Sequence, residues 1–256
     1  MRIALMLLIV DLAYVASIWP DWNQYARGAI PKSNFISLYE ADRKAHSDWP
    51  ELHWQPVPIA AIPRVVQRAV LLAEDRRFYE HNGFDLAAIR DAFDYNLNKG
   101  KIIRGASTIS QQTAKNLFLT PSRDPLRKWH ELILTWGLEQ NLAKQRILEI
   151  YLNSVEFGRG VYGVQAASFA YWGVPVGHLT VVQAAELATT LPSPVKNNPR
   201  ERTDFFIRRS QRILRLLARE FEVPPGLIGP ESEAGWVTIF DPETGRETGS
   251  YYAPVR

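Results

Sequence analysis

The sequence of 256 residues contains no cysteine. This absence excludes disulfide bonds, zinc sites built from thiolates and a cysteine nucleophile, and it leaves the redox compartment open. The chain also lacks a glycine-rich nucleotide loop and a Gly-x-Ser-x-Gly turn, and its five histidines do not have the spacing of metal ligands. Its basic residues are scattered and form no stripe suited to nucleic acid, so no nucleic-acid partner is expected.

The overall composition is that of a folded protein. Hydrophobic residues make up 46% of the chain and charged residues 22%, which argues against a disordered or fibrous protein. The formal net charge is +3 and the pI is about 9.1. Such a mildly basic balance suits an anionic membrane surface or a phosphorylated substrate, and many unrelated proteins share it.

The first residues form the most apolar part of the chain. Residues 3–19 are apolar except for Asp11 and Ser17, and Arg2 precedes them. This pattern predicts a transmembrane signal-anchor over residues 1–19 that leaves the rest of the chain outside the cytoplasm. A span needs about 20 residues, and an aspartate inside it costs about 2.5–3.5 kcal/mol. A cleaved signal peptide and a buried first helix are therefore alternatives.

The rest of the chain divides into three parts. Residues 20–63 contain six prolines and few periodic runs, so we expect a linker and an irregular lead-in there. Residues 64–228 form the predicted folded domain. Residues 229–256 form a tail of unknown role, a lid, a disordered end or a non-native extension, in which residues 236–240 could form the chain's one strand.

Hydrophobic periodicity predicts a mainly α-helical domain. Thr108 and Gln111 have the spacing of a capping box, which predicts that a helix starts there after a polar loop through Arg104 and Gly105. Residues 126–152 fit either two helices or one helix bent near Gly137. The other predicted helices cover residues 64–73, 86–97 with a stop at Lys99 and Gly100, 181–191 and 205–221.

Charged residues gather in three segments. Glu74 and Asp75 follow an apolar helix, where a carboxylate could serve as a general base or form an ordinary solvated helix end. Gln112 and Lys115 lie one turn apart on the helix that starts near Thr108, whose N-terminus could hold a diphosphate or simply face water. Arg127 and Glu131 have the spacing of an ion pair that needs no function.

In sequence order, these segments resemble the peptidoglycan glycosyltransferases. Members of that family are stand-alone enzymes or N-terminal domains of bifunctional penicillin-binding proteins. The resemblance covers most of residues 64–200, and the motifs that carry it are Glu74-Asp75-x-x-Phe78-x-x-His81-x-Gly83, Gly105-x-Ser107-Thr108-x-x-Gln111-Gln112-x-x-Lys115-Asn116, Arg127-Lys128-x-x-Glu131, Lys144-x-x-Ile147-Leu148-Glu149-x-Tyr151-Leu152-Asn153 and Gly158-x-Gly160-x-x-Gly163-Val164-x-Ala166-Ala167. The full set of transpeptidase motifs is not present, so the chain looks like a monofunctional transglycosylase.

The resemblance implies a lysozyme-like fold with a small membrane-facing lobe, and it implies the substrate lipid II. Glu74 would be the general base that activates the 4-hydroxyl of the acceptor sugar. Lys115 and Arg127 would stabilise the leaving diphosphate. Glu131 would orient the site or bind a divalent cation such as Mg²⁺ or Mn²⁺, the only cofactor considered. The residues that would line or brace the cleft are Asp75, Phe78, His81, Ser107, Thr108, Gln112 and Lys128. Glu149 is expected to have a structural role.

The resemblance also implies a location and partners. The catalytic domain would lie on the periplasmic side of the bacterial inner membrane, held by a single span. Its partners would be lipid II, the growing glycan chain and membrane lipid, together with other cell-wall synthesis or division proteins. We expect the apolar segment Leu117-Phe118-Leu119 to contact the membrane, since exposure of such a segment is unusual in a soluble protein.

Two other functions fit parts of the pattern. A lysozyme or lytic transglycosylase would also place a glutamate in a helical fold, but the cationic motifs favour a diphosphate donor. A catalytically silent membrane scaffold is the second alternative. It would have no physical need for both Glu74 and Glu131.

Overall fold

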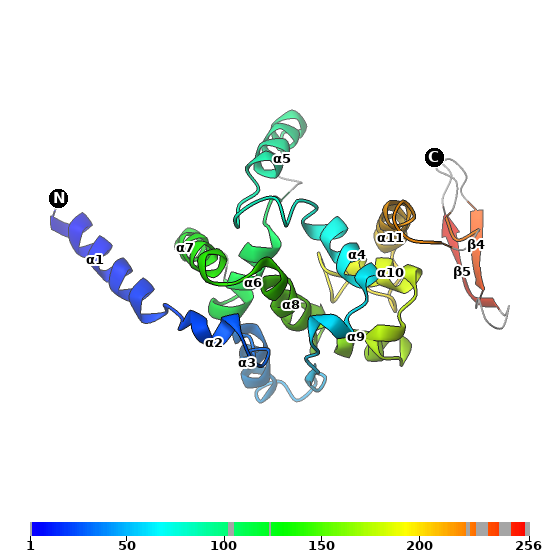
Figure 1. The fold of residues 1–256 in the computed structure, drawn as a ribbon, viewed down its shortest axis with the longest axis horizontal. Coiled ribbons are helices and arrows are strands. Elements are labelled where there is room, and N and C mark those ends of the chain that lie inside the picture. The colour runs from blue at the N-terminus through cyan, green and yellow to red at the C-terminus, as the bar shows by residue number, and fades with distance from the viewer. Residues whose placement is uncertain are drawn as a thin grey trace. The chain divides into compact units, whose positions relative to one another are not determined.

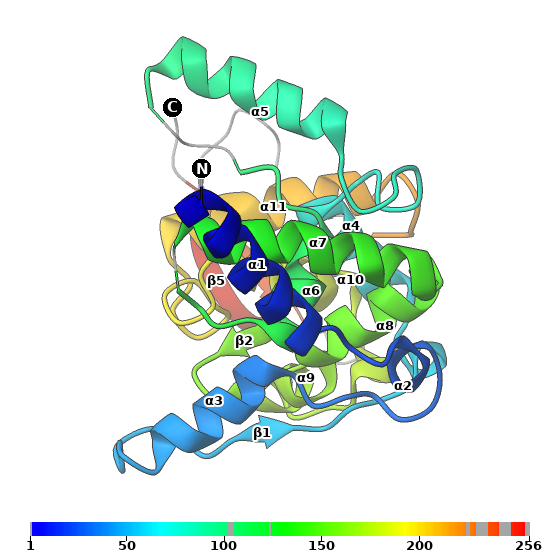
Figure 2. The same ribbon diagram turned by 90° about the vertical axis from the view of Figure 1, so that its left-hand side faces the viewer.

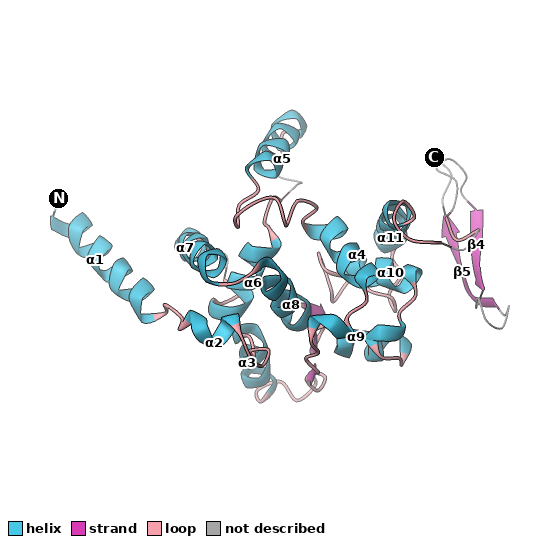
Figure 3. Cartoon of the chain, in the orientation of Figure 1, coloured by secondary structure: helices cyan, strands magenta, loops and turns pink. Residues whose placement is uncertain are grey.

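The computed structural model describes residues 2–101, 105–122, 124–223, 226–228, 235–240 and 247–253. Helices dominate these residues, which confirms the mainly helical prediction (Figure 3). The chain divides into two compact units. Unit 1 consists of Met1–Asp48 and Arg77–Val155, and unit 2 of Trp49–Arg76 and Glu156–Arg256. The expected polar loop through Arg104, and the parts of the tail around its strands, lie outside the described residues.

Unit 1 is helical and is built around α6. This helix packs against α3, α7 and α8, and its buried face includes Ile109, Thr113 and Ala114 (Figure 2). The helix α5 stands apart from α6, α7 and α8 (Figures 1 and 2). The helices of unit 1 are α1 Arg2–Ser17, α2 Trp22–Ala26, α3 Asn34–Arg43, α5 Leu86–Lys99, α6 Ile109–Phe118, α7 Pro125–Asn141 and α8 Lys144–Ser154.

The long helical stretch forms two helices, but the break is not at Gly137. It falls at Leu142 and Ala143, between α7 and α8. Gly137 lies inside α7, where a Cβ atom would come within 2.6 Å of Trp22 and 2.7 Å of Trp19. The glycine therefore makes room for two indole rings and does not end the helix.

The N-terminal segment forms the helix α1, which ends at Ser17 after 16 residues. None of the described helices has the length and apolar character that crossing a membrane requires. The predicted spanning anchor over residues 1–19 is therefore not supported. Asp11, the acidic residue within this apolar run, pairs with α7: its carboxylate accepts hydrogen bonds from His130 at 2.7 Å and Trp129 at 3.2 Å.

The lead-in is more ordered than expected, because two capped helices lie between its prolines. The side chain of Asp21 accepts a hydrogen bond from the N–H of Asn23 at the start of α2, and Ser33 caps α3 in the same way through Ile36. Arg146 of α8 holds this segment by donating to the carbonyl oxygens of Tyr25 and Ala29. Its third contact is with Glu149, at 2.6 Å, which agrees with a structural role for Glu149.

Unit 2 packs its helices around α10, which contacts both α4 and α11. Its body also contains a small sheet in the order β1–β3–β2, with β1 parallel and β2 antiparallel to β3, so the expectation of strands only in the tail was wrong. The elements of the body are β1 His53–Trp54, the 3-10 turns Ile59–Ala61 and Val176–His178, α4 Arg64–Glu74, β2 Glu156–Gly158, β3 Val161–Tyr162, α9 Val164–Trp172, α10 Val181–Thr190 and α11 Asp204–Leu217.

The strands of the sheet were missed because they are two or three residues long, too short for an alternating pattern. Gly158 in β2 shows why the family's glycine motif is needed here. A Cβ atom at this position would come within 2.7 Å of the hydroxyl oxygen of Tyr171, which donates to the carbonyl of Phe157. The motif therefore allows α9 to pack closely on β2.

The tail contains two antiparallel strands, β4 Gly235–Phe240 and β5 Glu247–Ala253. Gly235 pairs with Ala253 and Thr238 with Ser250, and the register shifts between Ile239 and Phe240. The predicted strand over residues 236–240 is confirmed.

Candidate active site

Glu74 is the last residue of α4, in unit 2. The helix ends there because Asp75 leaves the helical conformation while its N–H still bonds to the carbonyl of Leu71. The side chain of Glu74 is 14% exposed, and its carboxylate lies 3.2 Å from the guanidinium of Arg209 on α11. Asp75 is buried. The first predicted motif thus places one partly accessible carboxylate beside a buried one.

The rest of that motif belongs to unit 1 and lies against the start of α6. Thr108, the N-cap of α6, donates its hydroxyl to the carbonyl of Gly83 at 2.6 Å. The N–H of Gly83 donates to Nδ1 of His81, and Phe78 packs edge-on against the same imidazole. Gly83 has a φ of +92°, and a Cβ there would lie 3.0 Å from Thr135. Glycine is therefore required at this close approach.

A buried glutamate that sequence reasoning missed supports this loop. The side chain of Glu139 on α7 is 4% exposed, and it accepts hydrogen bonds from Ser110 of α6 and from Lys144 of α8. The ammonium of Lys144 also lies 4.5 Å from the ring centre of Phe78. The sequence offers Glu139 and Lys144 as charged residues near a helix boundary, but it does not show that both point inward.

The middle of α6 carries the predicted amide and ammonium groups. Gln112 accepts a hydrogen bond from the hydroxyl of Tyr151 at 3.1 Å, and the ammonium of Lys115 lies 5.7 Å from the ring centre of Phe35. Ser107 is exposed just before the N-cap. The capping box of Thr108 and Gln111 is present as predicted.

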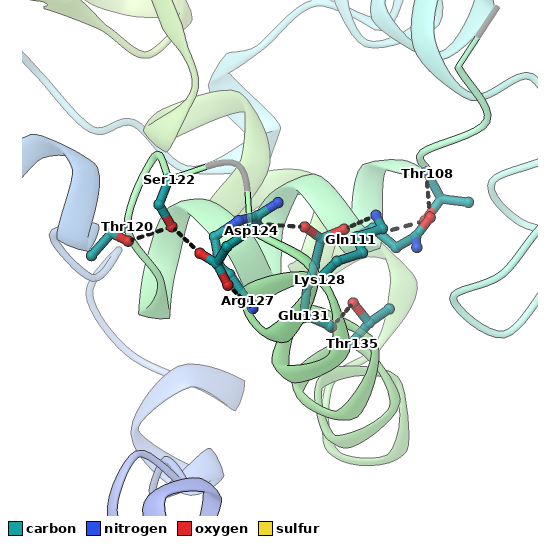
Figure 4. A network of polar contacts seen from close by, with 9 residues as sticks. All are labelled: Thr108, Gln111, Thr120, Ser122, Asp124, Arg127, Lys128, Glu131 and Thr135. Atoms are coloured by element: carbon teal, nitrogen blue, oxygen red, sulfur yellow. Dashed lines mark hydrogen bonds and ion pairs between the residues drawn. The ribbon is translucent and has the colours of Figure 1, made fainter. Parts of the chain in front are cut away.

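The third predicted motif forms a charged cluster on α7 (Figure 4). Arg127 donates to one carboxylate oxygen of Glu131 at 2.8 Å, and Lys128 donates to the other. Glu131 is 3% exposed, whereas Lys128 is 42% exposed. The Nε donor of Arg127 is buried and has no hydrogen-bond partner among the described residues. The cluster is therefore more than a solvated ion pair, because its acid is buried and one cationic donor is unused.

This geometry does not fit a divalent cation at Glu131. Each carboxylate oxygen already accepts a hydrogen bond from a cationic side chain, and a third cation would add like charge to the same buried place.

The segment Leu117-Phe118-Leu119 is not the exposed surface that we expected. Leu117 and Leu119 are 6% and 3% exposed. The ring of Phe118 packs against Trp22 and Tyr25, at centroid distances of 5.7 and 5.1 Å. The lead-in helix α2 covers this part of α6, which the sequence pattern could not show.

Sequence reasoning also missed the ionisable side chain of Glu156. Glu156 in β2 lies in a poorly solvated place, and burial raises its pKa to about 7 although Arg159 acts in the opposite direction. Burial likewise raises the pKa of the neighbouring Tyr171 to about 12, and the charge of Glu156 adds to that effect.

The eleven predicted site residues divide between the two units. Glu74 and Asp75 belong to unit 2, and the other nine belong to unit 1. Within unit 1 the structure joins Thr108 to the segment of His81, and Arg127 and Lys128 to Glu131.

Comparison with known proteins supports the resemblance to the peptidoglycan glycosyltransferases. Residues 43–218 match the family described as Transglycosylase. The biosynthetic peptidoglycan transglycosylase of Paraburkholderia xenovorans is 45% identical over 211 residues, which cover 79% of this chain and 88% of that relative. The protein of the same name from Bordetella avium is 39% identical over 229 residues, covering 88% and 93%. One from Burkholderia pseudomallei is 51% identical over 138 residues, and the match spans about half of that relative, 54% of its length.

The family match and these relatives identify a glycosyltransferase enzyme of peptidoglycan synthesis. The chain belongs to the transglycosylase family.

Replacing Glu131 with alanine should destabilise the protein strongly. The change would remove the carboxylate that pairs with both Arg127 and Lys128 and leave the mostly buried guanidinium of Arg127 beside a like charge, which costs about 3–5 kcal/mol. Urea unfolding followed by circular dichroism measures the loss. The control is Lys128→Ala, which removes an exposed partner and should cost less than about 1 kcal/mol. Equal losses in the two variants would show that Glu131 is not a buried ionic centre.

Glu156 should make stability depend on pH. Its pKa is higher in the folded chain than in the unfolded chain, so the unfolded state releases the proton first, and stability is lost as the pH rises from about 4.5 to about 7. Glu156→Gln should therefore be more stable than the wild type at pH 8, by on the order of 3 kcal/mol, and nearly equal to it at pH 4.5. Urea unfolding at both pH values tests this. The exposed Glu201→Gln control should follow the wild type, and a parallel pH dependence in all three proteins would rule the effect out.

Proposed function

We propose that this enzyme polymerises glycan strands with lipid II as both donor and acceptor. The 4-hydroxyl oxygen of the acceptor's N-acetylglucosamine attacks C1 of the donor's muramyl residue. The bond between that carbon and the diphosphate oxygen breaks, so undecaprenyl diphosphate leaves and an α-linked sugar becomes β-1,4-linked. Each cycle needs one group that accepts the proton of the hydroxyl and others that stabilise the leaving diphosphate.

Glu74 is the proposed general base. Its side chain is enclosed but still 14% exposed, and it ends a helix whose buried face is fixed against α10 and α11. A base must be held firmly and yet reach the proton it removes. The carboxylate takes the proton of the acceptor hydroxyl as the new glycosidic bond forms.

Arg127 and Lys115 are the proposed partners of the diphosphate. Arg127 supports this role best, because its guanidinium is held by Glu131 at 2.8 Å while its Nε donor has no partner among the described residues. A guanidinium that is already held in place by a carboxylate presents its charge to an anionic oxygen with little reorganisation. Glu131 then orients Arg127 and Lys128. The two cationic side chains held on one buried glutamate in the family's Arg-Lys-x-x-Glu motif are the observation that favours a diphosphate donor over a hydrolase substrate.

We also propose that the enzyme works at the periplasmic face of the inner membrane, where a lipid-linked substrate is anchored. The support comes from α5, which exposes four apolar side chains at helical spacing: Leu86 at 76%, Ile89 at 42%, Phe93 at 65% and Leu97 at 69%. Residues at these positions share one helix face. Asp85 is the N-cap of α5, and its carboxylate accepts hydrogen bonds from the N–H of Ala88 and from the guanidinium of Arg77. An apolar stripe on a helix that stands apart suits the surface of a bilayer.

A polymerisation assay with lipid II tests the proposed reaction directly. Wild-type protein in detergent should convert labelled lipid II into lysozyme-sensitive polymer, and Glu74→Gln should reduce the rate at least about 100-fold because a general base contributes 10²–10⁴-fold. The matched control is Glu80→Gln, which changes an exposed acid of the same segment and should retain activity. Normal polymerisation by Glu74→Gln would refute the role of Glu74. Loss of turbidity of purified sacculi, without polymer formation, would favour a hydrolase.

The apolar stripe of α5 should contribute to membrane affinity. Phe93→Ser combined with Leu97→Ser should weaken binding to anionic liposomes at least about tenfold, because burial of each apolar side chain contributes about 1.5–3 kcal/mol. Liposome co-sedimentation measures the change. Asn98→Ser, an exposed polar change on the same helix, is the control. Unchanged affinity of the double variant would mean that α5 does not face the lipid.

A further inference from the structure

Arg209 joins the proposed base to α11, a helix that follows the motifs of the family resemblance in the chain. It lies on α11, 135 residues after Glu74 in the chain. Its Nη2 group donates to the carboxylate of Glu74 at 3.2 Å and to the carbonyl oxygen of Ala73 at 3.0 Å. One nitrogen therefore holds the carboxylate and the backbone of the preceding residue together at the end of α4.

The position of Arg209 is set by the packing of α11. This helix begins at the cap Thr203 and buries Phe206, Ser210 and Ile213 on one face. It lies against α4 and α10 within unit 2 (Figure 1). Arg209 precedes the buried Ser210, and its side chain is only 27% exposed. Arg208, the residue before it, is exposed.

The surroundings of this contact favour a fixed charge over a loose surface pair. The side chains of Glu74 and Arg209 are both mostly covered, and Nε of Arg209 is buried without a hydrogen-bond partner among the described residues. Leaving a buried donor unused carries a cost. Nη2 of Arg209 makes both of its hydrogen bonds to the end of α4, one to the carboxylate of Glu74 and one to the carbonyl oxygen of Ala73.

We propose that Arg209 is a positioning residue for the general base. The guanidinium fixes the carboxylate of Glu74 relative to the end of α4. Arg209 does not touch the substrate in this proposal, and it acts only through Glu74. The inference rests on the proposed function of Glu74 as the base.

The kinetic prediction separates this role from simple packing. Arg209→Gln keeps a polar amide at this position but removes the charge and shortens the side chain. Its kcat for lipid II polymerisation should fall about 10- to 100-fold, while KM stays within about twofold, because the loss affects proton transfer and leaves substrate binding intact. Arg209→Lys keeps the charge without the planar fork and should recover part of kcat. Arg208→Gln, on the exposed side of α11, is the matched control and should behave as the wild type.

Thermal unfolding of each variant identifies a purely structural effect. Wild-type kcat in Arg209→Gln, equal losses in the glutamine and lysine variants, or a KM that rises with a lower Tm would each overturn the proposal. If Arg209→Gln does not fold, Arg209→Lys decides: a kcat within about tenfold of the wild type supports the role of the charge, and a larger loss at an unchanged Tm overturns it. No polymer from the wild type, or an active Glu74→Gln, would instead reject the proposed function itself.

Discussion

Unit 1 depends on the buried carboxylate of Glu139. It accepts hydrogen bonds from Ser110 at the start of α6 and from Lys144 at the start of α8, and Gly83 lies close to its side chain. Loss of one partner of a buried ion pair leaves an uncompensated charge, at a cost of about 3–5 kcal/mol. The carboxylate therefore ties two helix starts and the His81 loop to α7.

The same principle applies to the rest of α7 and to unit 2. Glu131, Thr135 and Glu139 follow one another at intervals of four residues and therefore share a helix face. A buried face with two acids is stable only if each acid has a cationic partner, and Arg127, Lys128 and Lys144 provide them. In unit 2, the cationic partner of Glu74 is Arg209. The charges that define the candidate chemistry thus also contribute to the packing, so changes at these positions affect stability as well as activity.

Local features of the fold could be predicted because neighbouring residues decide them. The capping box of Thr108 and Gln111, the end of α5 before Gly100 and the strand over residues 236–240 depend on interactions within a few residues. The ordered motifs also identified the family and hence the candidate residues. The helices of the lead-in were missed, although Asp21 and Ser33 are good N-cap residues, because the prolines around them suggested irregular structure.

The sequence by itself therefore determined the helical class, the bounds of α4, α5 and α10 to within two residues, and the family. Only the tertiary structure decided which side chains are buried and which distant residues meet. It covered Leu117 and Leu119, made Gly137 a contact for two tryptophans, and brought Arg209 to Glu74 across 135 residues. Periodicity records which face of a helix is apolar, but not which element covers it. That choice depends on the packing of all the helices together, so contacts between distant charges cannot be read from local sequence.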